Sequence, residues 1–417
     1  MFSKFTMTRT QRQQLAIERW KQAKCRGSIV AGTGFGKTRT ALDAIERVFA
    51  KNPNIPVTVV VPTKVLKNQW EEAIFKRNFD YPVNVLIINT AAKKPFNCVF
   101  LIIDECQHIS AEGMSKVFKN CSPTFILGLT ATYERLDGRE KQILDHYAPV
   151  CDEITINEAL SNGWVAPYVE YKVLLDVDLK EYDNANQLFL KCFSFFNFDW
   201  DLAMTVATNV FKAQQYAKHI NCTLKEVQSC AYGFIKSLKT RKSFIANHPK
   251  KLEIAKKIIE ARQHSKIITF NGSIKQCEAY DMGYVLHSGN TKKKNQMTVE
   301  EFSLCKEGAL HTSKMADEGL DIQGLNVAII TGFNSSKISK RQRIGRCIRF
   351  EPGKTAEIFT LVLKGTVEEK WYSKSGESLE YIEINEQELD SVLQGIPLKN
   401  KRKILQETTT FSNMLRF

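Results

Sequence analysis

A glycine-rich turn followed by Lys37 and Thr38 is the stretch of this sequence best suited to chemistry. An apolar run ends at Val30, and a helix is expected over residues 39–50. Glycines let backbone N–H groups point at a polyphosphate, and the helix N-terminus adds partial positive charge. Lys37 would reach the β- and γ-phosphates, and the Thr38 hydroxyl would hold Mg²⁺. The alternative is a flexible turn that happens to contain these residues. The predicted phosphate-binding residues are Gly32, Thr33, Gly34, Phe35, Gly36, Lys37 and Thr38.

Two adjacent carboxylates, Asp104 and Glu105, follow an apolar strand expected over residues 98–103. Carboxylates at such a place are costly unless they have partners or a role. With a phosphate-binding loop upstream, Asp104 would complete the Mg²⁺ shell and Glu105 would orient and deprotonate an attacking water. A helix N-cap with acidic residues in its first turn is the structural alternative, and both can hold at once.

Three further strands are expected to end in polar residues. Residues 57–61 run into Pro62, Thr63 and Lys64, residues 83–90 end at Thr90, and residues 124–129 precede Thr130. Ligands of open α/β sheets bind beyond the carboxyl ends of the strands, where Thr63 and Lys64 could touch a phosphate backbone. Strands that alternate with helices as far as residue 150 predict one doubly wound parallel sheet.

A glutamine-rich helix is expected over residues 11–24, just before the strand that leads into the glycine-rich turn. Its spacing places Ala16, Ile17 and Trp20 on one face. A glutamine amide carries both a donor and an acceptor, which suits the edge of an adenine. A plain amphipathic helix without a ligand is the alternative.

The composition of the chain indicates its binding partners and its cellular compartment. The 417 residues suggest two or three domains, and the formal net charge of +14 favours nucleic acid over an anionic membrane surface as partner, unless the charge serves solubility alone. Eleven scattered cysteines without a Cys-x-x-Cys pair argue for reduced thiols and against a disulfide framework or a zinc site. The N-terminus lacks a signal-peptide core, and the apolar runs are only strand-length. We therefore expect a cytoplasmic protein that does not enter a membrane.

Together these stretches resemble the superfamily 2 helicases and translocases. Seven motifs follow in the expected order: motif I at 31–38, Ia at 61–64, II at 104–107, III at 128–132, IV at 266–273, V at 312–322 and VI at 342–349. Residues 133–138 and 158–168 are similar to the branch of duplex-DNA repair helicases and phage branch-migration helicases. His287-Ser-Gly looks like the short element that follows motif IV.

The resemblance implies an α/β protein with two tandem RecA-like domains, each a parallel sheet flanked by helices. The expected limits are 1–165 for the first domain, 166–378 for the second with a helical insertion at about 178–250, and 379–417 for a C-terminal tail. Arg346 and Arg349 would enter the ATP site from across a cleft and stabilise charge on the transferring phosphoryl group. A solvated basic face is the alternative, but the spacing places Gln342, Arg346 and Arg349 near one helical face.

The same resemblance assigns the remaining site residues. Nucleotide binding would involve Gln13, Gly319, Asp321 and Gln342, and the nucleic-acid backbone would contact Pro62, Thr63, Lys64, Thr90, Thr312 and Ser313. This sequence departs from the motifs of that helicase branch in three respects. Gln107 stands where this branch usually has His, Gln11 competes with Gln13 as the adenine reader, and motif I begins with Ala31.

The insertion and the tail leave alternatives open. Aromatic residues between 189 and 200 could stack on bases or could form the core of a small helical subdomain. The tail could pack on the second domain or bind phosphate through its basic run at 399–403.

These observations predict an ATP- and Mg²⁺-dependent DNA helicase that works as a monomer on forked or branched DNA, in repair, recombination and branch migration. An RNA helicase of the same superfamily is one alternative. A non-catalytic nucleic-acid-binding module with an inactive motor is the other.

Overall fold

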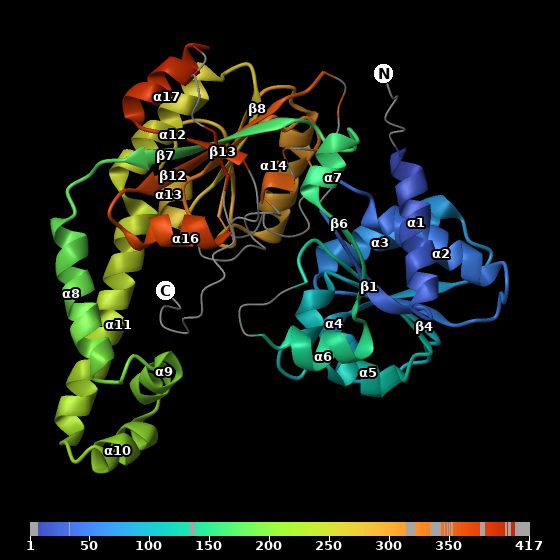
Figure 1. Ribbon diagram of the computed structural model, residues 1–417, viewed down its shortest axis with the longest axis horizontal. Helices are drawn as coiled ribbons and strands as arrows, with labels where there is room; N and C mark the ends of the chain where they lie inside the picture. Colours follow the sequence, from blue (N-terminus) through green and yellow to red (C-terminus); the bar gives the residue numbers. More distant parts are fainter. Residues whose placement is uncertain are drawn as a thin grey trace. The chain divides into compact units, whose positions relative to one another are not determined.

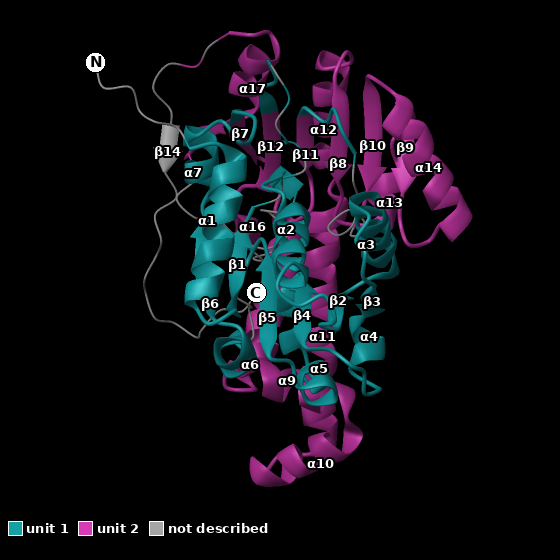
Figure 2. Ribbon diagram, turned by 90° about the vertical axis from the view of Figure 1, so that its right-hand side faces the viewer, with its two compact units in different colours: residues 1–168, 316–326, 337–356 teal, residues 169–315, 327–336, 357–417 magenta. Residues whose placement is uncertain are grey.

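Two compact units make up the molecule. A computed structural model describes residues 7–32, 34–133, 138–313, 322–333, 343–345, 347, 349, 351, 353–375, 380–396, 398 and 402–404. The first unit comprises residues 1–168, 316–326 and 337–356, and the second comprises residues 169–315, 327–336 and 357–417 (Figure 2). The domain limits at 165 and 378 stay a prediction.

The first unit is built on a parallel sheet in the order β3-β2-β4-β5-β1-β6. Its strands are β1 Arg26–Ala31, β2 Val57–Val61, β3 Val83–Ile87, β4 Phe100–Asp104, β5 Phe125–Thr130 and β6 Val150–Ile154. Every residue of β2 and β4 is buried, because β-branched and aromatic side chains pack on both faces of a central parallel strand. The predicted doubly wound sheet is confirmed.

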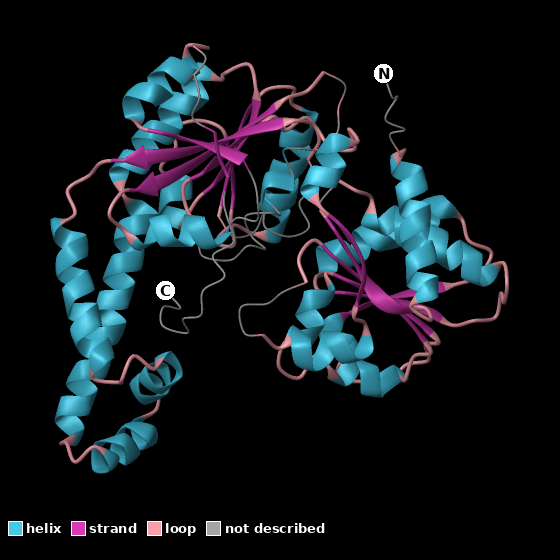
Figure 3. Ribbon diagram, in the orientation of Figure 1, coloured by secondary structure: helices cyan, strands magenta, loops and turns pink. Residues whose placement is uncertain are grey.

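Helices cover both faces of this sheet (Figure 3). They are α1 Arg9–Gln22, α2 Lys37–Phe49, α3 Lys64–Arg77, α4 Ile88–Ala91, the 3₁₀ helix η1 Cys106–Ser110, α5 Lys116–Cys121, α6 Glu140–Tyr147 and α7 Ile156–Ser161. Ala16, Ile17 and Trp20 are buried, as the spacing of α1 predicts.

Two details of the first unit differ from the sequence prediction. The strand expected over 83–90 ends at Ile87, and residues 88–91 form the short helix α4, which places Thr90 on a helix. β6 was not expected because two adjacent carboxylates, Asp152 and Glu153, interrupt its apolar residues. The buried carboxylate of Asp152 on β6 is paired with Arg12, whose Nη2 donates to Asp152 Oδ1 at 3.0 Å.

The second unit contains the sheet β14-β13-β7-β12-β11-β8-β10-β9. Neighbours from β12 to β9 run parallel, β13 runs parallel to β7, and β14 runs antiparallel to β13. The strands are β7 Tyr168–Leu175, β8 Lys266–Phe270, β9 Tyr284–Leu286, β10 Gly308–Thr312, β11 Val327–Ile330, β12 Ala356–Leu363, β13 Glu380–Ile384 and β14 Arg402–Ile404. The flanking helices are α12 Pro249–Ala261, α13 Ile274–Glu278, α14 Lys292–Leu304, α16 Val367–Ser375 and α17 Glu386–Leu393. Two parallel sheets flanked by helices confirm the predicted fold class.

The predicted insertion is helical and consists of α8 Lys180–Ser194, α9 Trp200–Thr208, α10 Val210–His219 and α11 Leu224–Asn247. α8 packs along α11, and α9 and α10 lie at the end of this pair away from the sheet (Figure 1). Phe189, Phe193 and Phe196 are buried in a core of the insertion, and Trp200 packs against that core. Phe198 is 50% exposed. Most of these aromatic residues therefore serve packing rather than base stacking.

The described part of the tail packs on the second unit. β13 pairs with β7, and Ile384, Leu389 and Val392 join the core beneath the sheet. The basic run at 399–403 falls partly outside the described residues.

All eleven cysteines are free thiols.

Across the described segments, each helix is too short or too polar to pass through a lipid bilayer.

Candidate functional site

The glycine-rich turn joins β1 to α2 as a phosphate-binding loop requires. Gly34 and Gly36 have φ angles of 89° and 93°, a region that suits glycine, and Gly36 caps the N-terminus of α2. Lys37 and Thr38 are the first two residues of α2. Lys37 Nζ donates to the carbonyl of Ala31 at 3.1 Å, so its ammonium group lies back over the loop. The loop thus combines helix N-terminus, glycines and lysine in one place.

Gln13 lies against this loop, whereas Gln11 does not. Gln13 Nε2 donates to the carbonyl of Phe35 at 2.7 Å, and Gln13 is buried. Within the described parts of the chain, Gln13 Oε1 has no hydrogen-bond donor. The side chain of Gln11 instead accepts from the backbone N–H of Thr8 in the capping box of α1. Gln13 is therefore the better candidate for reading an adenine.

Asp104 stands at the same edge of the sheet as the loop. Strand register pairs Asp104 of β4 with Leu129 of β5, and Thr130 of β5 with Val30 of β1. The carboxyl ends of three neighbouring strands therefore bring Asp104, Thr130 and the loop together.

The carboxyl group of Asp104 is buried and hydrogen-bonded at both oxygens. Oδ1 accepts from the backbone N–H of Glu105 at 3.0 Å, and Oδ2 accepts from Trp70 Nε1 at 2.8 Å. Burial, followed by the negative charge of Glu105, raises the pKa of Asp104 to about 6, while Trp70 and Lys37 oppose the shift. A cation bound here would favour the charged carboxylate.

Glu105 has a φ of 47°, which is uncommon for a residue with a side chain and costs free energy. Gln107 Nε2 donates to Glu105 Oε2 at 2.9 Å, and the Thr130 hydroxyl donates to Gln107 Oε1 at 2.6 Å. Thr132 N in turn donates to Thr130 Oγ1 at 2.9 Å. Gln107 thus connects the carboxylate of Glu105 to the loop that follows β5.

Arg349 belongs to the first unit by its contacts. It forms an isolated antiparallel bridge with Val165, and a Cβ placed on Gly34 would lie 3.9 Å from Arg349 Cγ. Burial lowers the pKa of the Arg349 guanidinium, with Glu351 opposing the shift. Arg349 therefore lies near the phosphate-binding loop. Five other predicted site residues lie outside the described residues: Thr33, Gly319, Asp321, Gln342 and Arg346.

The predicted nucleic-acid contacts of the first unit lie at the start of α3 and on α4. Thr63 is the N-cap of α3, where its hydroxyl accepts from Leu66 N at 3.3 Å, and Lys64 is exposed. Pro62 is half-buried and Thr90 is exposed. The side chain of Thr63 thus already has a structural role at the helix terminus.

In the second unit, Thr312 and Ser313 are buried at the end of β10. The Thr312 hydroxyl donates to the carbonyl of Ser313 at 2.8 Å, and Asn271 N donates to the carbonyl of Thr312 at 2.7 Å. Their predicted role in nucleic-acid binding stays a prediction.

The oxygen ligands, N–H groups and amide at this edge of the first sheet fit Mg²⁺ and ATP. Mg²⁺ prefers hard oxygen ligands, and Asp104 with the Thr38 hydroxyl offers such oxygens. Backbone N–H groups of the loop and the ammonium of Lys37 suit phosphates, and the unpaired acceptor of Gln13 suits an exocyclic amine.

Sequence reasoning missed two residues that touch this site. Trp70 donates to Asp104, and Arg9 Nη1 donates to the carbonyl of Gly34 at 3.3 Å. A buried tryptophan usually finds a partner for its indole N–H, so the sequence signalled that Trp70 needs an acceptor without identifying it.

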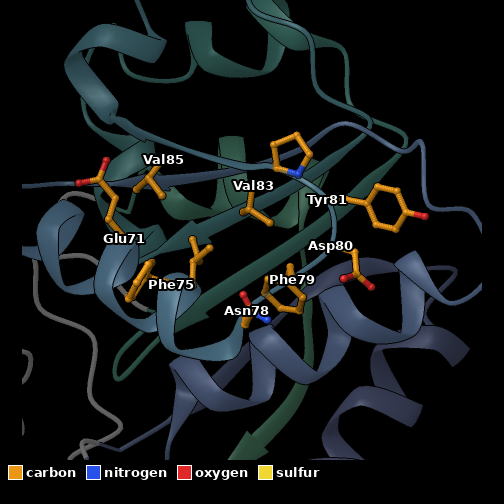
Figure 4. Close-up of a pocket in the computed structure, with 10 residues that line it drawn as sticks. Glu71, Phe75, Asn78, Phe79, Asp80, Tyr81, Val83 and Val85 are labelled. Carbon is orange, nitrogen blue, oxygen red and sulfur yellow. The ribbon is translucent and has the colours of Figure 1, made fainter.

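A shallow pocket of about 430 Å³ lies apart from these residues, between α3 and β3 (Figure 4). Val83 and Val85 of β3 and Phe75 of α3 contribute apolar surface, and Glu71 and Asp80 contribute carboxylates. None of the predicted site residues lines this pocket.

Two family models match the chain. One is described as Type III restriction enzyme, res subunit, and matches residues 6–95 and 88–135. The other is described as Helicase conserved C-terminal domain and matches residues 250–351.

Relatives that match most of the chain come from an archaeon and from viruses. The chain is 26% identical over 380 residues to the DNA 3'-5' translocase XPB2 of Sulfurisphaera tokodaii, covering 85% of this chain and 82% of the relative. It is 24% identical over 349 residues to the putative ATP-dependent RNA helicase L396 of Acanthamoeba polyphaga mimivirus, covering 78% and 57%. It is 25% identical over 368 residues to the putative helicase 22 of Sulfolobus islandicus filamentous virus, covering 79% and 58%. The chain thus spans less than two thirds of these two viral relatives.

Solved structures share the fold. The helicase domain of Pyrococcus furiosus Hef superimposes with a TM-score of 0.50 at 17% identity, covering 87% of this chain and 97% of that one. The DEAD-box helicase Mss116 bound to single-stranded RNA and UDP-BeF superimposes with a TM-score of 0.56 at 15% identity, covering 93% and 77%. The two sheets are therefore tandem RecA-like domains.

The fold, the family models and the relatives agree with the ordered motifs. The chain belongs to superfamily 2 of the helicases and translocases.

Proposed function

We propose that this chain is an ATP-dependent DNA helicase or translocase that acts on forked or branched DNA, in recombination, repair or branch migration. The observation that carries the proposal is the meeting of the phosphate-binding loop, Asp104 and Thr130 at the carboxyl ends of β1, β4 and β5. Such an edge suits hydrolysis of a nucleoside triphosphate, and superfamily membership favours coupling of that hydrolysis to a nucleic acid.

Each residue at this edge takes one role in the proposal. Lys37 and the loop backbone bind the phosphates, and Gln13 reads the adenine. Thr38 and Asp104 would hold Mg²⁺, which neutralises phosphate charge when bound. Glu105 orients the attacking water and accepts its proton, while Gln107 holds the Glu105 carboxylate through the 2.9 Å hydrogen bond.

Arg346 and Arg349 supply the positive charge that stabilises the transferring phosphoryl group. The position of Arg349 beside Gly34 supports this role. Cycles of ATP binding and hydrolysis would move the chain along a strand held at Pro62 to Lys64, Thr90, Thr312 and Ser313.

DNA is the favoured substrate. The relative matched over most of both chains is named a DNA translocase. One viral relative is named a putative RNA helicase, so an RNA helicase of the same superfamily is the second candidate.

A panel of nucleic acids tests the proposal. ATP hydrolysis and strand separation by the full chain are measured on single-stranded DNA, blunt duplex, fork, four-way junction and matched RNA, with Mg²⁺ present. We expect stimulated hydrolysis with all the DNA ligands that offer a single strand, and unwinding or remodelling of forks or junctions.

Two other outcomes would favour one of the alternative functions. Stimulation by RNA in preference to DNA would replace the proposal with the RNA helicase. Binding of nucleic acid without any hydrolysis would leave a non-catalytic module with an inactive motor.

A further inference from the structure

Trp70 forms a direct link between α3 and the carboxylate of Asp104. Its indole Nε1 donates to Asp104 Oδ2 at 2.8 Å, and its side chain is 1% exposed. The other carboxylate oxygen, Oδ1, accepts from the backbone N–H of Glu105. Removal of the indole N–H would therefore leave Oδ2 of a buried carboxylate without this donor, and the bond from Glu105 N to Oδ1 would orient the carboxylate less firmly.

α3 is a surface helix of the first unit. Trp70 alone among its fourteen residues is buried. At the C-terminal end, Arg77 Nη2 forms an ion pair with Asp43 of α2 at 2.7 Å and a second one with Glu46. The pocket of about 430 Å³ lies between the C-terminal half of α3 and β3 (Figure 4). A helix above such a hollow can shift more easily than one packed at full density.

The two ends of α3 make different contacts. Its first turn presents Thr63 and the exposed Lys64, which the proposed function places on the nucleic-acid backbone. Trp70 follows less than two turns later on the same rigid helix, and Arg77 ties the far end to α2, the helix that begins with Lys37. A displacement of the first turn of α3 would therefore reach Asp104 through the Trp70 side chain.

We infer that Trp70 is the positioning residue that couples nucleic-acid binding at the N-terminus of α3 to the orientation of Asp104. This inference rests on the proposed function and adds a mechanism of regulation to it. When nucleic acid binds Thr63 and Lys64, α3 carries the indole N–H to the place where it holds Asp104 for hydrolysis. Trp70 contacts neither the nucleotide nor the nucleic acid in this mechanism.

A second tryptophan offers a matched control. Trp20 of α1 is 2% exposed, donates its indole N–H to the carbonyl of Ile126 at 2.7 Å, and stacks on Phe100 at the opposite end of β4. Trp70→Phe and Trp20→Phe each remove one N–H donor and a similar volume from a helix of the first unit. Only Trp70→Phe removes a donor from Asp104.

The test measures thermodynamic coupling as well as activity in the full chain. Affinity for a fluorescein-labelled oligo(dT) is measured by anisotropy with and without Mg²⁺ and a non-hydrolysable ATP analogue. If the nucleotide changes this affinity by some factor, the oligonucleotide must change nucleotide affinity by the same factor. The ratio of stimulated to basal ATP hydrolysis is measured in parallel, and thermal unfolding reports the stability of each variant.

We expect Trp70→Phe to bind oligo(dT) with the wild-type affinity when no nucleotide is present. Two ratios should each fall by about fivefold or more in this variant: the factor by which the nucleotide changes the affinity for oligo(dT), and the ratio of stimulated to basal ATP hydrolysis. Trp20→Phe should lower the unfolding midpoint to a similar extent and keep both ratios within about twofold of the wild type.

Two results would overturn the inference: Trp70→Phe keeps both ratios, or Trp20→Phe loses them equally. A wild-type chain that neither binds oligo(dT) nor responds to it would instead overturn the proposed function, and the inference with it. The two failures are distinguishable because the first appears only in the variants.

Discussion

Gln107 holds two residues of the candidate site with one side-chain amide. Its nitrogen donates to Glu105, and its oxygen accepts from Thr130. The resemblance to duplex-DNA helicases leads one to expect histidine here, and a neutral histidine also offers one donor and one acceptor. The departure from histidine therefore preserves the hydrogen-bonding capacity that positions Glu105.

We predict that Gln107→Ala lowers kcat for stimulated ATP hydrolysis by about a hundredfold while the KM for ATP changes little. A misplaced Glu105 would orient the attacking water poorly, and a small misplacement can cost this much. Steady-state kinetics of ATP hydrolysis provide the measurement, with Gln228→Ala on the exposed face of α11 as control. An Ala variant with wild-type kcat would show that Gln107 does not position Glu105.

His311 on β10 is a buried imidazole whose charge state affects stability. Thr269 Oγ1 lies 3.0 Å from its Nδ1, the carbonyl of Met282 lies 2.9 Å from its Nε2, and Tyr280 stacks on the ring at 3.8 Å. Burial lowers the pKa of His311 to about 4, with the Met282 carbonyl opposing the shift. The imidazole therefore binds a proton more readily in the unfolded chain than in the folded chain. The free energy of unfolding rises with pH between the folded pKa of about 4 and the ordinary pKa of histidine.

Between about pH 7 and pH 5, we expect the His311 contribution to the free energy of unfolding to fall by about 2 kcal/mol. Urea unfolding at both pH values measures the loss. The His311→Gln variant should lose less stability over this range than the wild type. His264→Gln, at a side chain that is 83% exposed, should behave as the wild type does. An equal pH response of wild type and His311→Gln would contradict this account.

At the scale of elements, a buried ion pair ties α12 to α16 in the second unit. Lys251 Nζ lies 2.6 Å from Glu368 Oε1, and both side chains are fully buried. Lys251 also donates to the carbonyl of Thr331 after β11, and Glu368 Oε2 accepts from Leu363 N at the end of β12. The pair thus connects two helices with the ends of two strands.

Breaking this pair should destabilise the second unit. We predict that Lys251→Met costs about 3–5 kcal/mol in free energy of unfolding, because it leaves a buried carboxylate without its counter-charge. Urea unfolding of the full chain is the measurement. Adding Glu368→Gln to Lys251→Met should recover part of the loss, since the amide oxygen can still accept from Leu363 N without carrying a charge.

The neighbouring lysine supplies the control for this prediction. Lys250 pairs with Glu253 and Glu386 at the surface, so Lys250→Met should cost about 1 kcal/mol or less. Equal losses from Lys250→Met and Lys251→Met would show that burial does not govern the pair.

At the scale of the whole molecule, local patterns predicted the first parallel sheet because its strands are apolar and end in polar residues, whereas the second RecA-like domain was expected from the resemblance of its motifs. Asp104 and Glu105 could be predicted for this reason, since they directly follow a buried strand. β6 and β13 could not, because their charged residues hide the alternation that marks a strand. Trp70 could be expected in the core, but its acceptor Asp104 lies 34 positions away in the sequence, so only the fold reveals the hydrogen bond.

Whole-molecule charge and family membership point to the same partner. A net charge of +14 favours a polyanion, and the chain belongs to a superfamily of nucleic-acid motors. We therefore propose that one site in the first unit hydrolyses ATP and that nucleic acid stimulates this hydrolysis.

The decisive measurement is ATP hydrolysis by the full chain, with and without single-stranded DNA, in the wild type and in Lys37→Ala. We expect hydrolysis that requires Mg²⁺, rises at least about tenfold with DNA, and falls by about a hundredfold or more in Lys37→Ala. Lys67→Ala, which alters a surface lysine of α3 in an ion pair with Glu71, should hydrolyse ATP at close to the wild-type rate. Hydrolysis that persists in Lys37→Ala would show that this site is not the one that hydrolyses ATP, and a wild type that hydrolyses no ATP with any nucleic acid would show that the chain is not such a motor.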